Sequence, residues 1–112
     1  MTDLETAAIY YRAFEARSDF SEVPFAEKLR FRGPNGEVEG AGTLRPMLAG
    51  LAARHAGLAM RHQVAAEGQV ISVYDFDLSL EGGAIPMAER LEIRDAEIVE
   101  VELLFDAARM AP

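Results

Sequence analysis

The feature that most constrains the fold is a long alternation of apolar and polar residues in the second half of the chain. This alternation predicts four strands, at Leu58–Ala66, Val70–Leu80, Ala84–Arg94 and Ile98–Asp106. Short polar turns at residues 67–69, 81–83 and 95–97 join the strands, and two of these turns contain glycine. Such a pattern is typical of an antiparallel sheet with one apolar face and one polar face.

The alternation assigns each side chain of the sheet to one of these faces. The predicted inner face is mainly apolar and carries Met60, His62, Val64, Tyr74, Phe76, Leu78, Met87, Glu89, Leu91, Ile93, Val99, Val101, Leu103 and Phe105. The predicted outer face carries Arg61, Gln63, Asp75, Asp77, Arg90, Glu92, Glu100 and Glu102, with Ile71, Val73, Ile98 and Leu104 between them. An apolar face needs a cover, which the first half of the chain must supply.

The first half of the chain predicts two helices that can form this cover. Helical spacing indicates a helix over Asp3–Arg17, with Tyr11 near the centre of its apolar stripe and Tyr10 on its flank. Thr2 or Asp3 can cap its start. A second helix is expected to begin at Thr43 and to end at Gly57, with His55 on its apolar stripe.

A strand at Ala26–Arg32, a tight turn over residues 33–36 and a brief return strand at Glu37–Gly40 separate the two helices. We therefore expect a single α+β domain over residues 1–112. Its curved antiparallel sheet forms a cone-like half-barrel, with the helices packed on the concave face and a pocket between the two layers.

Composition excludes several classes of function. The net charge of −8 argues against binding to nucleic acid or to an anionic membrane. The absence of cysteine excludes disulfides and thiolate chemistry. The N-terminus does not resemble a signal peptide, because Asp3 and Glu5 interrupt it, so a cytoplasmic protein is expected.

Three segments of the chain resemble the nuclear transport factor 2-like superfamily, and within it the SnoaL-like group. They are the helix segment Ile9–Phe14 followed by Asp19, the segment Leu29–Pro34 with Gly40, and the ending from Glu97 to Asp106. The resemblance implies a cone-shaped α+β barrel of the cystatin-like type with a deep apolar pocket, often dimeric through the outer sheet face. Members include ketosteroid isomerases, polyketide cyclases, epoxide hydrolases, dehydratases and binding modules without catalytic activity.

Two positions depart from the family pattern. The isomerases carry a general base just before the proline of the first turn, and Gly33 stands there in this chain. The cyclases carry an acid on the last strand, and its place falls near Leu103. The resemblance therefore implies that both of the best-known acids are missing.

Glu89 is the most informative candidate for a catalytic group, because it is the one acid on the predicted inner face. A buried carboxyl requires a hydrogen-bond partner or a proton, and its pKa is expected to rise. The alternative is a bulged or terminal position that turns Glu89 outward. His62 is a second candidate proton carrier, or else a core histidine bonded to a backbone carbonyl.

We expect Tyr11 or Tyr74 to donate to a ligand carbonyl, with Tyr10 in place of Tyr11 if the helix is rotated. The side chains expected to contact the ligand are Tyr74, Phe76, Met60, Leu103 and Phe105. We expect no metal and no cofactor, because the two histidines have no ligand spacing and no phosphate-binding loop is present.

The sequence therefore predicts a homodimer that binds a small apolar or carbonyl-containing ligand. Acid–base chemistry of the isomerase, cyclase or dehydratase type is one expectation for such a pocket. The alternative is a dimeric module that binds a ligand or a protein without catalysis.

Overall fold

The computed structural model describes residues 1–110, which form two α-helices, one short 3₁₀ helix and a six-stranded sheet. The helices are α1 (Asp3–Glu15), α2 (Ala41–Arg54) and the 3₁₀ helix η1 (Ala107–Met110). The strands are β1 (Phe25–Gly33), β2 (Gly36–Glu39), β3 (Gly57–Ala66), β4 (Gln69–Asp77), β5 (Ile85–Arg94) and β6 (Glu97–Leu104). The α+β class and the order of the predicted elements are confirmed, with ends that differ by a few residues.

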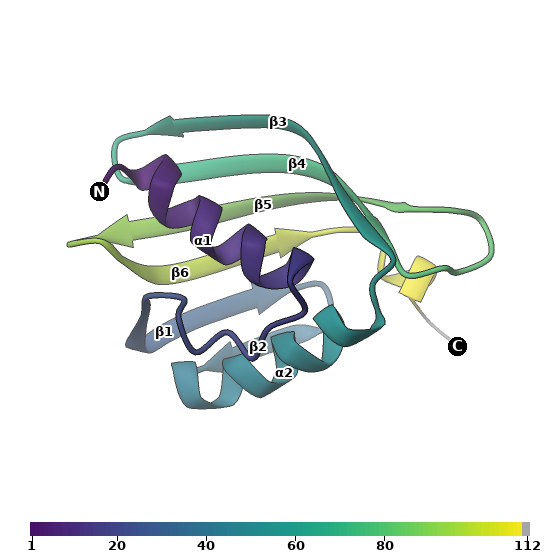
Figure 1. The fold of residues 1–112 in the computed structure, drawn as a ribbon, viewed down its shortest axis with the longest axis horizontal. Helices are drawn as coiled ribbons and strands as arrows, with labels where there is room; N and C mark the ends of the chain where they lie inside the picture. The colour runs from purple at the N-terminus through teal and green to yellow at the C-terminus, as the bar shows by residue number, and fades with distance from the viewer. Residues whose placement is uncertain (111–112) are drawn as a thin grey trace.

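The six strands form one curved, open sheet in the order β2-β1-β6-β5-β4-β3 (Figure 1). All neighbouring strands are antiparallel except β1 and β6, which are parallel. The prediction of a wholly antiparallel sheet is wrong for this one pair. The sequence pattern cannot fix its direction, because no hairpin joins β1 to β6 and four strands and α2 intervene in the chain.

The two helices lie on the same side of the sheet (Figure 1), and α1 packs against β3 and β4 while α2 packs against β1 and β2. A capping box fixes the start of α1, because Thr2 Oγ1 accepts from the Glu5 N–H at 3.1 Å and Glu5 Oε1 accepts from the Thr2 N–H at 2.8 Å. The buried face of α1 then carries Tyr10, Tyr11 and Phe14. The second helix begins at Ala41 rather than Thr43, with Gly40 at φ 91° as its N-cap.

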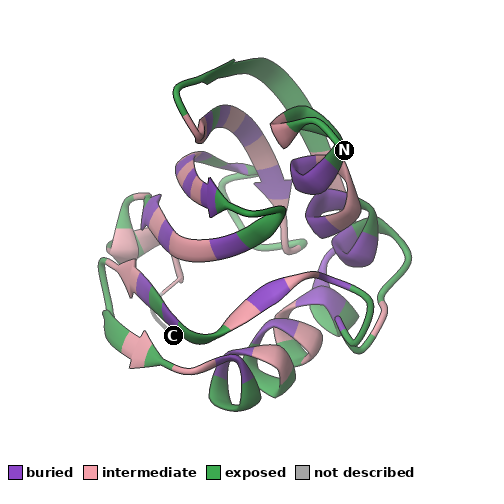
Figure 2. Ribbon diagram, turned by 90° about the vertical axis from the view of Figure 1, so that its left-hand side faces the viewer, coloured by how far each residue is buried: buried purple, intermediate pink, exposed green. Residues whose placement is uncertain are grey.

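A bulge in β3 changes which of its residues face the core. Met60 pairs with Tyr74 and His62 pairs with Val73, so Arg61 is one residue in excess. The extra residue inverts the alternation beyond it, which moves His62 to the outer face and Gln63 to the inner face. Figure 2 shows β3 exposed along most of its length, whereas buried residues alternate along β4 and β5. The predicted inward positions of His62 and Val64 are therefore wrong.

A second irregularity lies at the start of β6. Ile93 pairs with Ile98 and Glu92 pairs with Glu100, which leaves Val99 in excess. Ile98 is consequently fully buried, although the alternation predicted it on the outer face. The cause is again a local bulge, which the regular spacing of a strand pattern cannot represent.

Among the described residues, no helix has both the length and the apolar character needed to cross a membrane.

Candidate functional site

A cavity of about 580 Å³ lies between the two helices and the inner face of the sheet. Its walls are mainly apolar and include Phe14, Phe31, Leu48, Phe76, Leu103 and Phe105. The turn between β1 and β2 and the residue Met110 of η1 complete its rim. Cavities of this volume and character are typical of sites that hold small organic molecules.

Glu89 of β5 lines this cavity and is only 2% exposed. Three phenol hydroxyls donate to its carboxyl group: Tyr10 to Oε2 at 2.8 Å, Tyr11 to Oε1 at 2.9 Å and Tyr74 to Oε1 at 2.9 Å. The inward position predicted for Glu89 is confirmed, and its catalytic role stays a prediction. We refer to these four residues as the Glu89–tyrosine cluster.

The three tyrosines reach Glu89 from two elements. Tyr10 and Tyr11 are consecutive residues of α1, and their rings meet edge to face at 5.1 Å between centroids. Tyr74 lies on the neighbouring strand β4, where it pairs with Met87 and is therefore diagonal to Glu89 on the inner face. The sequence predicted Tyr10 and Tyr11 as alternatives, and the structure places both at the carboxyl group. All three tyrosines of the chain belong to this cluster.

Burial dominates the electrostatics of the cluster. Desolvation raises the pKa of Glu89 above its ordinary value, although the three tyrosine hydrogen bonds act in the opposite direction. Burial and the neighbouring Glu89 charge also raise the pKa values of Tyr10, Tyr11 and Tyr74. The hydroxyls therefore keep their protons, and Glu89 is the group of the cluster whose charge changes first as the pH rises from acid values.

A further chain of polar groups supports Tyr11 from the side of β3 and β4. Gln63 Nε2 donates to Ser72 Oγ at 3.0 Å, and the Ser72 side chain partly opposes the burial that raises the pKa of Tyr11. Ser72 is fully buried and pairs directly with Glu89 across β4 and β5. Sequence reasoning missed both residues. The alternation could have found Ser72, two positions before Tyr74, whereas Gln63 reaches the inner face only through the β3 bulge.

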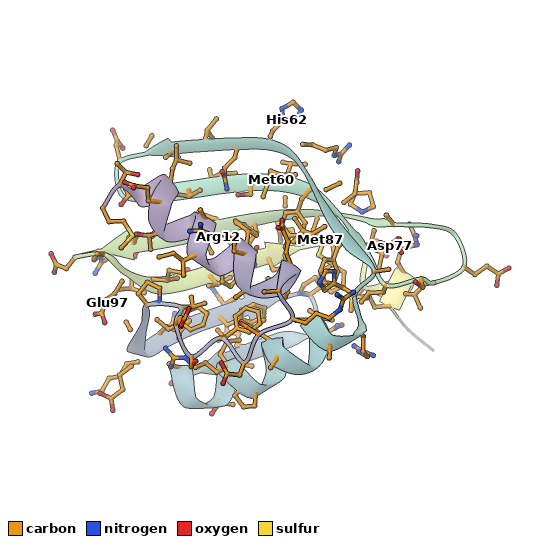
Figure 3. The ribbon with its side chains drawn as sticks, viewed as in Figure 1. Arg12, Met60, His62, Asp77, Met87 and Glu97 are labelled. Atoms are coloured by element: carbon orange, nitrogen blue, oxygen red, sulfur yellow. The ribbon has the colours of Figure 1, made fainter. Side chains whose placement is uncertain are left out.

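The two remaining candidates on β3 lie away from the cavity. His62 is exposed on the outer face, and Figure 3 shows its ring at the edge of the sheet, pointing away from the helices. A pair between His62 and Glu89 is therefore excluded by the fold. Met60 is 38% exposed, and it is not among the residues that line the cavity. The prediction that these two residues line the cavity is wrong. His62 is turned outward by the bulge at Arg61, and Met60 lies on an edge strand that α1 covers incompletely.

The other predicted lining residues, namely Tyr74, Phe76, Leu103 and Phe105, all border the cavity. Gly33 also borders it, so the cavity is lined at both positions where the resemblance implies an acid, and neither residue has a carboxyl side chain. Their roles in ligand contact stay predictions.

The second histidine has a structural explanation. His55 caps α2, its Nε2 lies 2.6 Å from the carbonyl oxygen of Phe14, and its ring stacks on Phe76 with 5.6 Å between centroids. Because a carbonyl oxygen only accepts, Nε2 is the protonated nitrogen of this ring. His55 thereby connects the ends of α1 and α2 to β4, and it is not among the residues that line the cavity.

No group of three His, Asp or Glu side chains within residues 1–110 is arranged to hold a metal ion. Within the same residues, no cation forms an ion pair with Glu89.

No protein-family model and no curated protein matches the sequence. Solved structures do match the fold. A protein from Kribbella flavida has a TM-score of 0.86 at 25% identity, covering 96% of this chain and 88% of that one. An NTF2-like protein of unknown function from Cytophaga hutchinsonii has a TM-score of 0.85 at 16% identity, covering 98% and 95%.

A steroid delta-isomerase from Pseudomonas aeruginosa has a TM-score of 0.77 at 17% identity, covering 93% of this chain and 79% of that one. At such identities the likeness concerns the fold. The fold of the chain is therefore that of NTF2-like proteins, and the fold implied by the resemblance of the sequence is confirmed.

Proposed function

We propose that this protein binds a small, largely apolar molecule in the cavity, with a polar group of that molecule at Glu89. One observation carries the proposal: a fully buried carboxyl group, held by three tyrosines, borders a cavity of about 580 Å³. Burying a carboxyl group in a core without a cavity would cost folding free energy. Polar groups that converge on an apolar cavity are typical of ligand sites.

The walls of the cavity favour an apolar ligand body. Four phenylalanines and the side chains of Leu48, Met87 and Leu103 border it, so a ligand that fills the space would bury mostly carbon. Each buried methylene group of such a ligand contributes about 0.8 kcal/mol, so apolar contact would supply most of the favourable binding free energy.

Acid–base chemistry at Glu89 is a second candidate function. The raised pKa of Glu89 supports it, because a carboxyl group that titrates nearer to neutral pH exchanges protons more readily with a substrate. In this form of the proposal, protonated Glu89 donates to a ligand carbonyl. The hydroxyls of Tyr11 and Tyr74 are already committed to Glu89, so they position the acid rather than hold the carbonyl themselves.

A non-catalytic module is the form of the proposal in which the ligand is bound and released unchanged. It requires the same cavity and the same cluster, and it differs in that no bond of the ligand changes. Mass spectrometry of each bound compound after incubation with the protein separates the two forms.

A fragment screen by ligand-observed NMR tests ligand binding in the cavity. We expect apolar fragments with one polar group to bind the wild type and to lose binding in Gly33→Leu. A Cβ at Gly33 would meet Phe31 at 3.4 Å, an ordinary contact, so the variant is expected to fold and to occupy part of the cavity.

The matched control is Gly42→Leu, an exposed position on α2 where an added Cβ meets nothing within 4 Å. Fragments that bind wild type, Gly33→Leu and Gly42→Leu equally would bind elsewhere, and the proposal would then be wrong.

A further inference from the structure

We propose that the ligand of this cavity carries a protonated amine, which forms an ion pair with the carboxylate of Glu89. This inference rests on the proposed function and narrows its ligand to one chemical class: apolar molecules with a single cationic nitrogen.

The first argument is charge. All three donors to Glu89 are neutral hydroxyls, and no Lys, Arg or His within residues 1–110 pairs with it. Neutral donors satisfy the hydrogen bonding of a buried carboxylate but leave its charge uncompensated. A cation supplied by the ligand would complete the pair in the place where desolvation makes the attraction strong.

The second argument is the number of bonds on each carboxyl oxygen. Oε1 accepts from Tyr11 and Tyr74, whereas Oε2 accepts from Tyr10 alone. A carboxylate offers about four acceptor positions, two on each oxygen, so one position on Oε2 remains for a further donor. A ligand ammonium group brings such a donor, whereas a ligand carbonyl oxygen brings none.

The third argument is the aromatic character of the walls. Tyr10, Phe14, Tyr74 and Phe76 border the cavity near the cluster, and the faces of such rings attract a cation. The other charged side chains that border the cavity are Glu37 on β2 and Arg54 at the end of α2. Both are exposed, so solvent screens their charges more than that of Glu89.

Three probes with one apolar body test the inference: naphthylmethylamine, naphthylmethanol and naphthylacetate. Their dissociation constants are measured by isothermal titration calorimetry on wild type, Glu89→Gln, Glu37→Gln and Glu100→Gln. We expect the amine to bind wild type at least about tenfold more tightly than the alcohol, and the acid to bind most weakly.

The variants locate the charge that causes this preference. We expect Glu89→Gln to bind the amine and the alcohol equally, because an amide carries no charge. Glu100 lies on the outer face, away from the cavity, and Glu100→Gln is expected to keep the full preference. Loss of the preference in Glu37→Gln but not in Glu89→Gln would overturn the inference.

The pH profile of the wild type needs no variant. The amine preference should rise as the pH passes upward through the pKa of Glu89, where the carboxylate forms, and fall at alkaline pH when the amine loses its proton. Glu89 is faced by Tyr10 and Tyr11 from α1 and by Tyr74 from β4, whose raised pKa values keep them neutral over this range.

An alcohol that binds as tightly as the amine, or a preference that survives Glu89→Gln, overturns the inference and leaves ligand binding itself intact. Binding by none of the three probes also overturns it, whereas the fragment screen with Gly33→Leu tests the proposed function separately.

Discussion

The hydroxyl of Tyr10 lies 2.8 Å from Oε2 of Glu89, although 79 positions separate the two residues in the chain. This contact joins α1 to β5 through the core, at the end of the cavity. The hydroxyl of Tyr11 donates to the other oxygen, Oε1, so two consecutive residues of α1 hold the carboxyl group of Glu89. The cluster therefore fixes both the position of α1 on the sheet and the polar end of the site.

The first prediction concerns the stability that these hydroxyls provide. We expect Tyr10→Phe and Tyr74→Phe each to lower the free energy of unfolding by about 1.5 to 3 kcal/mol, the usual range for a hydrogen bond to a charged group. Urea unfolding in neutral buffer measures the loss.

The control for these variants is Thr6→Val, because the buried Thr6 hydroxyl donates to a neutral backbone carbonyl, that of Thr2, at 3.2 Å. Its expected cost is about 1 kcal/mol. Tyrosine variants that cost no more than Thr6→Val would show that Glu89 carries no charge in the folded protein at that pH.

The second prediction concerns pH and stability. Glu89 has a folded pKa above the ordinary value of 4.5, so the folded chain binds its proton more tightly than the unfolded chain does. Its contribution to the free energy of unfolding is therefore present below pH 4.5 and declines as the pH rises through the folded pKa. Relative to Glu89→Gln, the wild type should lose stability over this interval.

Glu100 provides a control of opposite sign. Hydrogen bonding from Arg32 lowers its pKa, so its contribution is present above pH 4.5 and is lost as the pH falls through the folded pKa. Unfolding curves of the wild type and of both Gln variants between acid and neutral pH give the free energy of unfolding at each pH. The difference between wild type and variant then has a slope against pH for each of the two residues. Slopes of the same sign would contradict the assignment of Glu89 as a desolvated carboxyl.

The third prediction is a homodimer through the outer face of the sheet. Val64, Ile71 and Leu104 are 62%, 44% and 60% exposed on that face, beside the row of ion pairs from Arg32 through Glu100 to Arg90. A face of mixed charges and aliphatic side chains can pair with its own copy across a two-fold axis. Light scattering should show a dimer in the wild type at micromolar concentration.

We expect Leu104→Lys to shift this equilibrium toward monomer, because it places a cation in the paired face. Leu4→Lys on α1 is the matched control, since Leu4 is equally an exposed leucine but lies on a helix rather than on the sheet. A monomeric wild type, or an equal fraction of dimer in the two variants, would show that the outer face is not the dimer interface.

The fourth prediction is negligible steroid isomerase activity. Gly33 and Leu103 border the cavity at the two positions where the resemblance implies acids in the isomerases and cyclases, and neither side chain can accept a proton. The three tyrosine hydroxyls are committed to Glu89, so none is left to stabilise an enolate oxygen. An ultraviolet assay with a β,γ-unsaturated ketosteroid measures the rate, and robust turnover would show that Glu89 or another group acts as the base.

The sequence predicted the fold and the position of Glu89 because β4 and β5 pair without interruption. Along these strands the simple alternation holds, and Tyr74, Phe76 and Glu89 all face the core as expected. On β3 the same reasoning placed His62 inside. One extra residue at Arg61 reverses the alternation, and no residue type marks the position of such a bulge.

The tyrosines show a different limit of sequence reasoning. Helical spacing treated Tyr10 and Tyr11 as alternatives, since consecutive residues of a helix point about 100° apart. Both side chains are long, and the carboxyl group of Glu89 lies between their two directions, so each hydroxyl reaches a different oxygen. This convergence depends on how α1 crosses the sheet, which tertiary packing decides.

The central claim is that Glu89 is a desolvated carboxyl group at the polar end of a ligand cavity. A carboxyl-carbon NMR titration of the wild type, with Glu89→Gln to assign the signal, tests it most directly. We predict a midpoint above the ordinary glutamate value of 4.5, because burial outweighs the three hydrogen bonds from tyrosine. A midpoint at or below 4.5 would contradict the claim and would remove the physical basis for acid–base chemistry at this site.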